Sequence, residues 1–201
     1  MKWSDPDFRW SIDVSTVPAI EPVTPEDLRA HCRIDGNDEE STLQSYIKAA
    51  RLMVEEDTQR ALITQTLQLK MDSFPSDVIE LRRCPVLAVS SIAYTDTDAA
   101  SQTLAASNYV VDIGSKPGRV TLAYGESWPL TYSQANAVTV TFTAGYGTTP
   151  TSVDERARQA IRLLAGHWAI NREAVIVGTI SKEIELSYWS VIEKLRWHGY
   201  R

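Results

Sequence analysis

Three groups of residues in this sequence have types that could carry chemistry. The first is the acidic run Glu55-Glu56-Asp57, whose carboxylates could hold a cation. The run falls near the expected C-terminal end of a helix, where the helix dipole disfavours negative charge. We therefore expect a solvated helix face there, with an ion pair to a neighbouring subunit as the main alternative.

The second group is the pair His31-Cys32, whose residue types occur together in nucleophilic sites. Neighbours on a helix diverge by roughly a hundred degrees, so these two side chains are not expected to form a nucleophile–base dyad. Cys32 is expected to pack as a small apolar side chain. The chain has 3 His and 2 Cys in all, with no HExxH motif, and their spacing predicts no metal site.

The third group is the glycine-containing segment Ala144-Gly145-Tyr146-Gly147. It lacks the lysine of a phosphate-binding P-loop and the third glycine of a dinucleotide fingerprint, so we interpret it as a turn that leaves a strand. Ser90-Ser91 falls inside a predicted strand instead of a nucleophile elbow. The sequence thus predicts no catalytic, cofactor-binding or metal-binding residues and a protein that is not an enzyme.

The composition is that of a globular protein. The 201 residues are 43% hydrophobic and carry a net charge of −6, and a chain of this length needs no disulfide or metal to fold. The sequence contains no apolar run of about 18 residues, so no membrane-spanning helix is predicted. Acidic residues exceed basic ones in residues 1–62, and basic residues exceed acidic ones in residues 151–201. Because tight nucleic-acid binders carry basic stripes, DNA binding is not predicted as the main activity.

Helical signals occur at both ends of the chain. Thr24 is a predicted N-cap with Pro25 at the first helical position, and this helix is expected to end near Gly36. A second helix is expected up to Gln59. After residue 150, Ser152 and Glu155 have the spacing of a capping box. A last amphipathic segment is expected to have three residues on one side: Tyr188, Ile192 and Leu195.

Between these helices the hydrophobic period changes from 3.6 to 2 at residue 63. Further strands are expected at 78–81, 89–95, 109–113, 119–124 and 138–143. The last of these alternates apolar residues with threonines, which is typical of an antiparallel sheet with one wet face. We predict an α+β fold, a helical body with an inserted antiparallel β subdomain. The predicted parts are an extended N-terminal arm (1–22), a helical body with a C-terminal docking tail (23–62 and 151–201), and the insert (63–150).

An ordered series of segments resembles the head–tail connector (adaptor) proteins of tailed bacteriophages and gene transfer agents. The similarity covers about residues 20–180. Its segments are Val23 through Asp35, Gln59 through Thr66, Leu81 through Val86, Tyr109 through Asp112, Gly118 through Val120, Tyr124 through Pro129, Val138 through Gly147, and Ala160 through Thr179 with its His167-Trp168 and Asn171-Arg172-Glu173-Ala174 motifs.

The resemblance implies a structural role without cofactors. Members of this family form a ring, usually dodecameric, beneath the portal of the capsid. The ring joins the portal protein to a downstream neck or stopper protein, and double-stranded DNA passes through its lumen without specific binding. The implied location is the virion neck, with assembly in the host cytoplasm and no membrane contact. The alternative is another tail-completion or neck assembly protein on the same fold, and an unrecognised enzyme is the least favoured interpretation.

The C-terminal segment is the predicted portal-docking site, because the resemblance assigns portal contact to this region. Aromatic and basic side chains at an exposed end are typical of protein–protein hot spots. The residues concerned are Tyr188, Trp189, Lys194, Arg196, Trp197, His198, Tyr200 and Arg201. The alternative is a solvated terminus with Trp197 packed on the core. We expect a chain without residues 188–201 to fold but to lose portal binding.

Overall fold

The computed structural model describes residues 8–36, 39–171 and 182–196. They form four α-helices and two antiparallel sheets, which confirms the predicted α+β class. The chain divides into two compact units. The β unit contains residues up to Val17 and residues 64–145, and the helical unit contains residues 18–63 and those from Tyr146 onward. None of the described helices has the length and apolarity that crossing a membrane requires.

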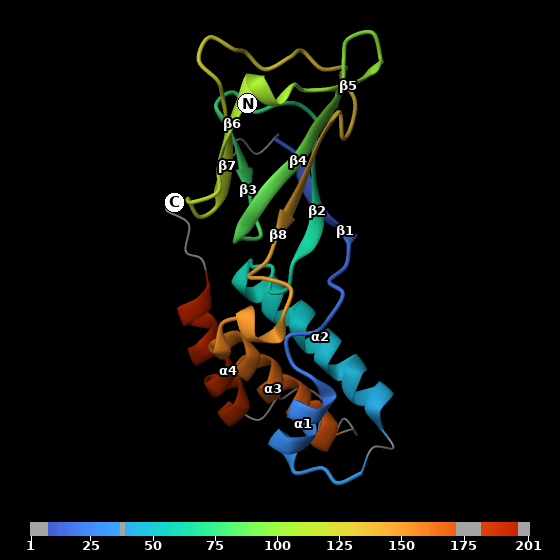
Figure 1. The fold of residues 1–201 in the computed structure, drawn as a ribbon, viewed down its shortest axis with the longest axis vertical. Coiled ribbons are helices and arrows are strands. Elements are labelled where there is room, and N and C mark those ends of the chain that lie inside the picture. The colour runs from blue at the N-terminus through green and yellow to red at the C-terminus, as the bar shows by residue number, and fades with distance from the viewer. Residues whose placement is uncertain (1–7, 37–38, 172–181, 197–201) are drawn as a thin grey trace. The chain divides into compact units, whose positions relative to one another are not determined.

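The helical unit is built from α1 (Pro25–Cys32), α2 (Glu40–Thr58), α3 (Glu155–Ile170) and α4 (Lys182–Leu195). Figure 1 shows the last three helices side by side. Their apolar stripes meet in one core, as the helical spacing of the sequence predicted. Its fully buried large side chains include Leu28, Leu43, Ile47, Leu62 and Ile161.

The helix ends confirm one sequence prediction and correct two. Thr24 is the N-cap of α1, and its hydroxyl accepts a hydrogen bond from the backbone N–H of Asp27 at 3.0 Å. The helix ends at Cys32, before the predicted Gly36, because Arg33 takes the left-handed conformation (φ 55°) and its N–H bonds back to the Arg29 carbonyl.

The predicted capping box at the start of α3 is wrong. The N-cap is Asp154, whose carboxylate accepts from the backbone N–H of Arg156 at 2.9 Å. Ser152 belongs to the preceding 3-10 turn, and its hydroxyl donates to the Thr149 carbonyl at 2.6 Å. An Asp two residues nearer the helix thus takes the capping role that the sequence pattern assigned to the serine.

The β unit contains a five-stranded and a three-stranded antiparallel sheet (Figure 1). The larger sheet has the order β1-β2-β8-β4-β5, with bounds Trp10–Thr16, Gln65–Met71, Val138–Ala144, Val86–Thr95 and Ser101–Thr103. The smaller has the order β3-β7-β6, with bounds Val78–Leu81, Gly118–Leu122 and Tyr109–Asp112. Alternate residues of β2 and β8 are buried, as the period of 2 predicted. Leu69, pairing with Val140, is one fully buried example.

The described part of the predicted N-terminal arm contains a strand of the larger sheet and is not a separate extended arm. Residues 10–16 form β1, an edge strand that pairs antiparallel with β2. Asp13 adds an ion pair with Lys70 of β2 at 2.8 Å. Trp10, Ile12 and Val14 alternate with polar residues, but the repeat is too short to stand out among the surrounding prolines and aspartates. The arm therefore belongs to a sheet whose other strands lie more than forty residues later.

Candidate interaction surfaces

One face of α4 forms part of the core of the helical unit. Tyr188, Ile192 and Leu195 are each at most 2% exposed, and they follow the spacing of one helical face. The hydroxyl of Tyr188 donates to Asp57 of α2 at 2.6 Å. Arg60 donates from its guanidinium to the Leu195 carbonyl at 2.7 Å. The described part of α4 is thus a packed element of the fold.

The opposite face of α4 carries exposed apolar and basic side chains. Leu186 is 71% exposed and Trp189 is 39% exposed. Trp189 packs edge-on against the ring of Tyr188, with 5.5 Å between ring centroids, so the indole sits on a fixed support. Glu193, one turn after Trp189, is exposed, as are Lys194 and Arg196, the latter just after the end of the helix. This combination of a supported aromatic ring and nearby cations suits a protein interface.

The predicted docking residues therefore fall into three groups. Trp189 and Lys194 are exposed on α4, and Arg196, also exposed, follows the end of this helix. Tyr188 lies in the core, which corrects its placement among the surface residues: its ring fills a space against α2 and its hydroxyl is used by Asp57. The remaining four lie outside the described residues: Trp197, His198, Tyr200 and Arg201.

The acidic run of α2 is not the solvated face that the sequence predicted. Glu55 is only 5% exposed, and its carboxylate accepts from Arg51 at 2.7 Å and from the backbone N–H of Leu62 at 2.8 Å. Asp57 accepts from Tyr188, and Glu56 alone is exposed. Two of the three carboxylates thus serve the internal structure of the helical unit.

Arg51 joins that network to the segment that precedes α1. Its side chain is 3% exposed and lies between two carboxylates, Glu55 on its own helix and Glu21 on the segment, each at 2.7 Å. A buried cation between two anions has its desolvation cost offset by short charge-assisted hydrogen bonds. The three residues therefore fix the segment against α2.

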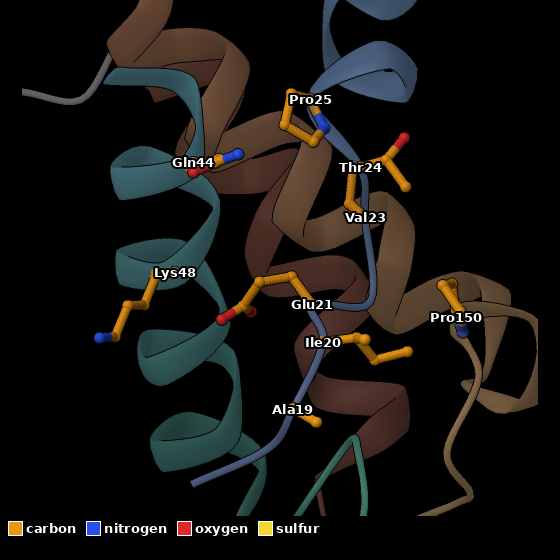
Figure 2. Close-up of a pocket in the computed structure, with 9 residues that line it drawn as sticks. All are labelled: Ala19, Ile20, Glu21, Val23, Thr24, Pro25, Gln44, Lys48 and Pro150. Atoms are coloured by element: carbon orange, nitrogen blue, oxygen red, sulfur yellow. The ribbon is translucent and has the colours of Figure 1, made fainter. Parts of the chain in front are cut away.

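A shallow groove of about 530 Å³ lies beside this network (Figure 2). Its lining is mostly apolar: Ala19, Ile20, Val23, Pro25 and Pro150, with Glu21, Thr24, Gln44 and Lys48 as polar members. Figure 2 shows the Lys48 ammonium pointing away from the other lining side chains, and the Glu21 carboxylate binds Arg51. The groove thus brings together no acid, base and nucleophile that could work on one substrate.

The other two chemical groups have structural roles. Cys32 packs against the helical core near Gly166 of α3, where an added Cβ would lie 2.9 Å from the cysteine sulfur. Burial raises the pKa of the Cys32 thiol, which disfavours the nucleophilic thiolate. Tyr146 follows the end of β8 and its hydroxyl accepts from Arg60 at 2.7 Å. Among residues 8–36, 39–171 and 182–196, no three His, Cys, Asp or Glu side chains are grouped to hold a metal.

The Tyr188–Asp57 contact predicts how stability changes in alkaline solution. Burial, and then the bond to Asp57, raise the pKa of Tyr188 above the usual 10, so the native protein keeps a proton that the unfolded chain loses above pH 10. The free energy of unfolding should then fall as the pH rises, by less than about 1.4 kcal/mol per pH unit.

Urea unfolding of the wild type and Tyr188→Phe at pH 9 and pH 11 tests this expectation. The variant lacks the hydrogen bond and should be less stable at pH 9 by about 1 kcal/mol. At pH 11 that difference should shrink. Tyr124→Phe changes a fully exposed phenol and is the matched control. A difference that stays constant between the two pH values would contradict the assignment.

Comparison with solved structures shows which proteins share this fold. The chain shares its fold with a chain in the virion of a native gene transfer agent (GTA) particle, with a TM-score of 0.77, 21% identity, and coverage of 94% of this chain and 97% of that one. A chain from the neck of an empty GTA particle, computed with C6 symmetry, gives 0.78 at 21% identity, with 95% and 97% covered.

A third match, from the neck of a native GTA particle computed with C12 symmetry, has a TM-score of 0.71 at 21% identity, again with 95% and 97% covered. The model of the phage gp6-like head-tail connector protein family matches residues 23–112. The family match confirms the resemblance to head–tail connector proteins, and the solved structures show that the chain shares the fold of chains from GTA particles and their necks. No curated protein matches the chain by sequence.

Proposed function

We propose that this chain is a head–tail connector (adaptor) that forms a ring beneath the portal of a tailed phage or gene transfer agent. The observation that carries the proposal is the family match over residues 23–112, together with a fold shared along almost the whole chain with neck proteins. Two of those necks were computed with C6 and C12 symmetry, which supports a ring of identical subunits, dodecameric in our proposal. A closed ring needs two different, matching patches on each subunit.

The ring joins the portal protein to a downstream neck or stopper protein, and double-stranded DNA passes through its lumen without specific binding. A net charge of −6 favours passage over retention of a polyanion. The protein acts in the virion neck after assembly in the host cytoplasm, without a cofactor or membrane contact, and it is not an enzyme. A tail-completion protein on the same fold would occupy a different position in the particle.

The portal contact is assigned to the exposed face of α4. Trp189 supplies an aromatic anchor supported by Tyr188, and the exposed Lys194 and Arg196 add positive charge at the C-terminal end of the helix. Hot-spot residues of this kind often cost more than 2 kcal/mol on removal, which is a weakening of about thirtyfold. The four terminal residues named above extend the proposed contact.

The experiment is co-assembly of the full chain with the purified portal, followed by electron microscopy. The variant Trp189→Ala with Lys194→Glu and Arg196→Glu should bind the portal at least thirtyfold more weakly while its circular dichroism and unfolding midpoint stay close to those of the wild type. Lys48→Glu, a change at an exposed position of α2, should bind normally. Wild-type protein placed away from the portal in particles would contradict the connector assignment, and normal binding by the triple variant would contradict the α4 assignment.

A further inference from the structure

A long loop of the β unit, residues 123–137, connects β7 to β8 and carries three exposed large apolar side chains, among them the two most exposed of the described residues. Tyr124 is fully exposed, Leu130 is 80% exposed, and Tyr132 is 45% exposed. Loops of this length without regular structure are uncommon in compact domains and are usually functional. Large apolar side chains gathered on one loop are also more than the scattered exposure expected of a surface.

The first exposed side chain sits on a fixed turn. The N–H of Glu126 donates to the Ala123 carbonyl at 3.1 Å, and Gly125 takes φ +82° at the third position of this turn. A positive φ at that position is readily adopted by glycine and rarely by other residues. Ala123 is itself held, because its N–H donates to the Asn108 carbonyl at 3.0 Å. Tyr124 is therefore presented by a defined backbone.

The second exposed side chain lies between two anchors. Trp128 stacks on Phe74, with 4.9 Å between centroids and a 6° interplanar angle. The N–H of Tyr132 donates to the Thr95 carbonyl at 3.0 Å, and the Gln134 side chain donates to the Thr95 hydroxyl at 3.1 Å. Leu130 falls midway between these fixed points. A loop held at both sides loses little conformational entropy when it binds, which favours affinity.

The surroundings of the loop are acidic. The turn that follows β4 lies at the same end of the β unit (Figure 1) and contains Asp96 and Asp98, and Glu126 lies on the loop itself. The sequence has no Lys or Arg between Arg83 and Lys116 or between Arg119 and Arg156. A surface with this charge repels nucleic acid. A partner surface that complements it would be apolar, with basic groups around the apolar part.

We propose that loop 123–137 is a docking surface for a second neck protein, different from this chain, that presents an apolar patch flanked by Lys or Arg. The inference rests on the proposed function, and it gives the connector a second docking surface on a different compact unit from α4. Tyr124, Leu130 and Tyr132 supply the apolar contacts. The carboxylates of Asp98 and Glu126 favour a partner with basic groups around its apolar patch.

The test is site-specific photocross-linking in particles assembled with the full chain. Benzoylphenylalanine replaces Tyr124 in one preparation, Val110 of β6 in a second as an exposed control in the same unit, and Trp189 in a third. Cross-linked peptides are identified by mass spectrometry. We expect the analogue at Tyr124 to cross-link to a peptide of another protein that contains Lys or Arg beside apolar residues. Asp98→Lys with Glu126→Lys should lower that yield at least tenfold, and Asp98→Glu should not.

Three outcomes would overturn the inference: cross-links from Tyr124 to copies of this chain, cross-links to DNA, or a yield no higher than that from Val110. The Trp189 preparation separates this failure from failure of the proposed function. Cross-links from Trp189 to the portal with none from Tyr124 would remove only the loop assignment. Cross-links from Tyr124 to a second neck protein with none from Trp189 would remove only the α4 assignment. Absence of the chain from particles would overturn both.

Discussion

Replacing Arg51 with methionine should lower the free energy of unfolding by about 3 kcal/mol, because removal of one partner from a buried ion pair leaves an uncompensated charge. The Glu55 carboxylate would remain buried with the Leu62 N–H as its partner, and Glu21 would lose its link to α2. Methionine is close to arginine in length, so the change removes charge and hydrogen bonds more than volume. Guanidinium unfolding at pH 7 measures the effect.

Lys48→Met is the matched control, because Lys48 lies one turn earlier on α2 and is exposed. Its effect should stay within about 0.5 kcal/mol. The double variant Arg51→Met with Glu55→Gln should recover part of the lost stability, since it removes the stranded charge. A loss below 1 kcal/mol for Arg51→Met would show that the network contributes specificity of packing without net stability.

Deleting residues 188–201 should unfold the helical unit, contrary to our expectation from the sequence. The deletion removes Tyr188, Ile192 and Leu195 from the core together with the carbonyl that Arg60 binds. Burial of each such side chain is worth about 1.5–3 kcal/mol, so the total is comparable with the 5–15 kcal/mol of a whole domain. Portal binding by this truncation therefore cannot be interpreted as a docking experiment.

A chain that ends at Arg196 is the informative counterpart. It keeps all three buried side chains and should unfold within about 1 kcal/mol of the full chain, since it removes none of the described core. Circular dichroism at 222 nm and thermal unfolding of the two truncations provide the comparison. A cooperative, native-like transition in the chain that lacks residues 188–201 would contradict the role given to α4.

The regular elements could be predicted because their signals are local. The stripe of α2 and the alternation of β2 and β8 each lie within one element, and the structure confirms them. Tyr188, Ile192 and Leu195 were also correctly placed on one face of the last helix. The error was to give Tyr188 a surface role as well, because periodicity shows which residues share a face but not which face is covered.

The features that the sequence did not predict depend on contacts between distant residues. Glu55 is buried beside its cation Arg51, and Arg51 also binds Glu21, which lies thirty residues earlier in the chain. The docking loop is held in place by Thr95, whose hydroxyl accepts a hydrogen bond from Gln134, 39 residues later in the chain. The sequence did contain one signal for this loop: two long stretches, 84–115 and 120–155, have no Lys or Arg, and the second includes the aromatic residues of the loop. Only the anchors show that these side chains are held in place.

The pairing of β1 with β2 has a consequence for anyone who wishes to express the β unit alone. A gene fragment for residues 64–145 would lack Trp10–Thr16 and would leave β2 with bare backbone donors and acceptors. Such a fragment is expected to self-associate through this exposed strand edge. A fragment in which the end of β1 is joined through a short glycine-rich linker to residue 64 would keep β1 beside β2, because Thr16 pairs with Thr66, and is the more promising route to an isolated sheet.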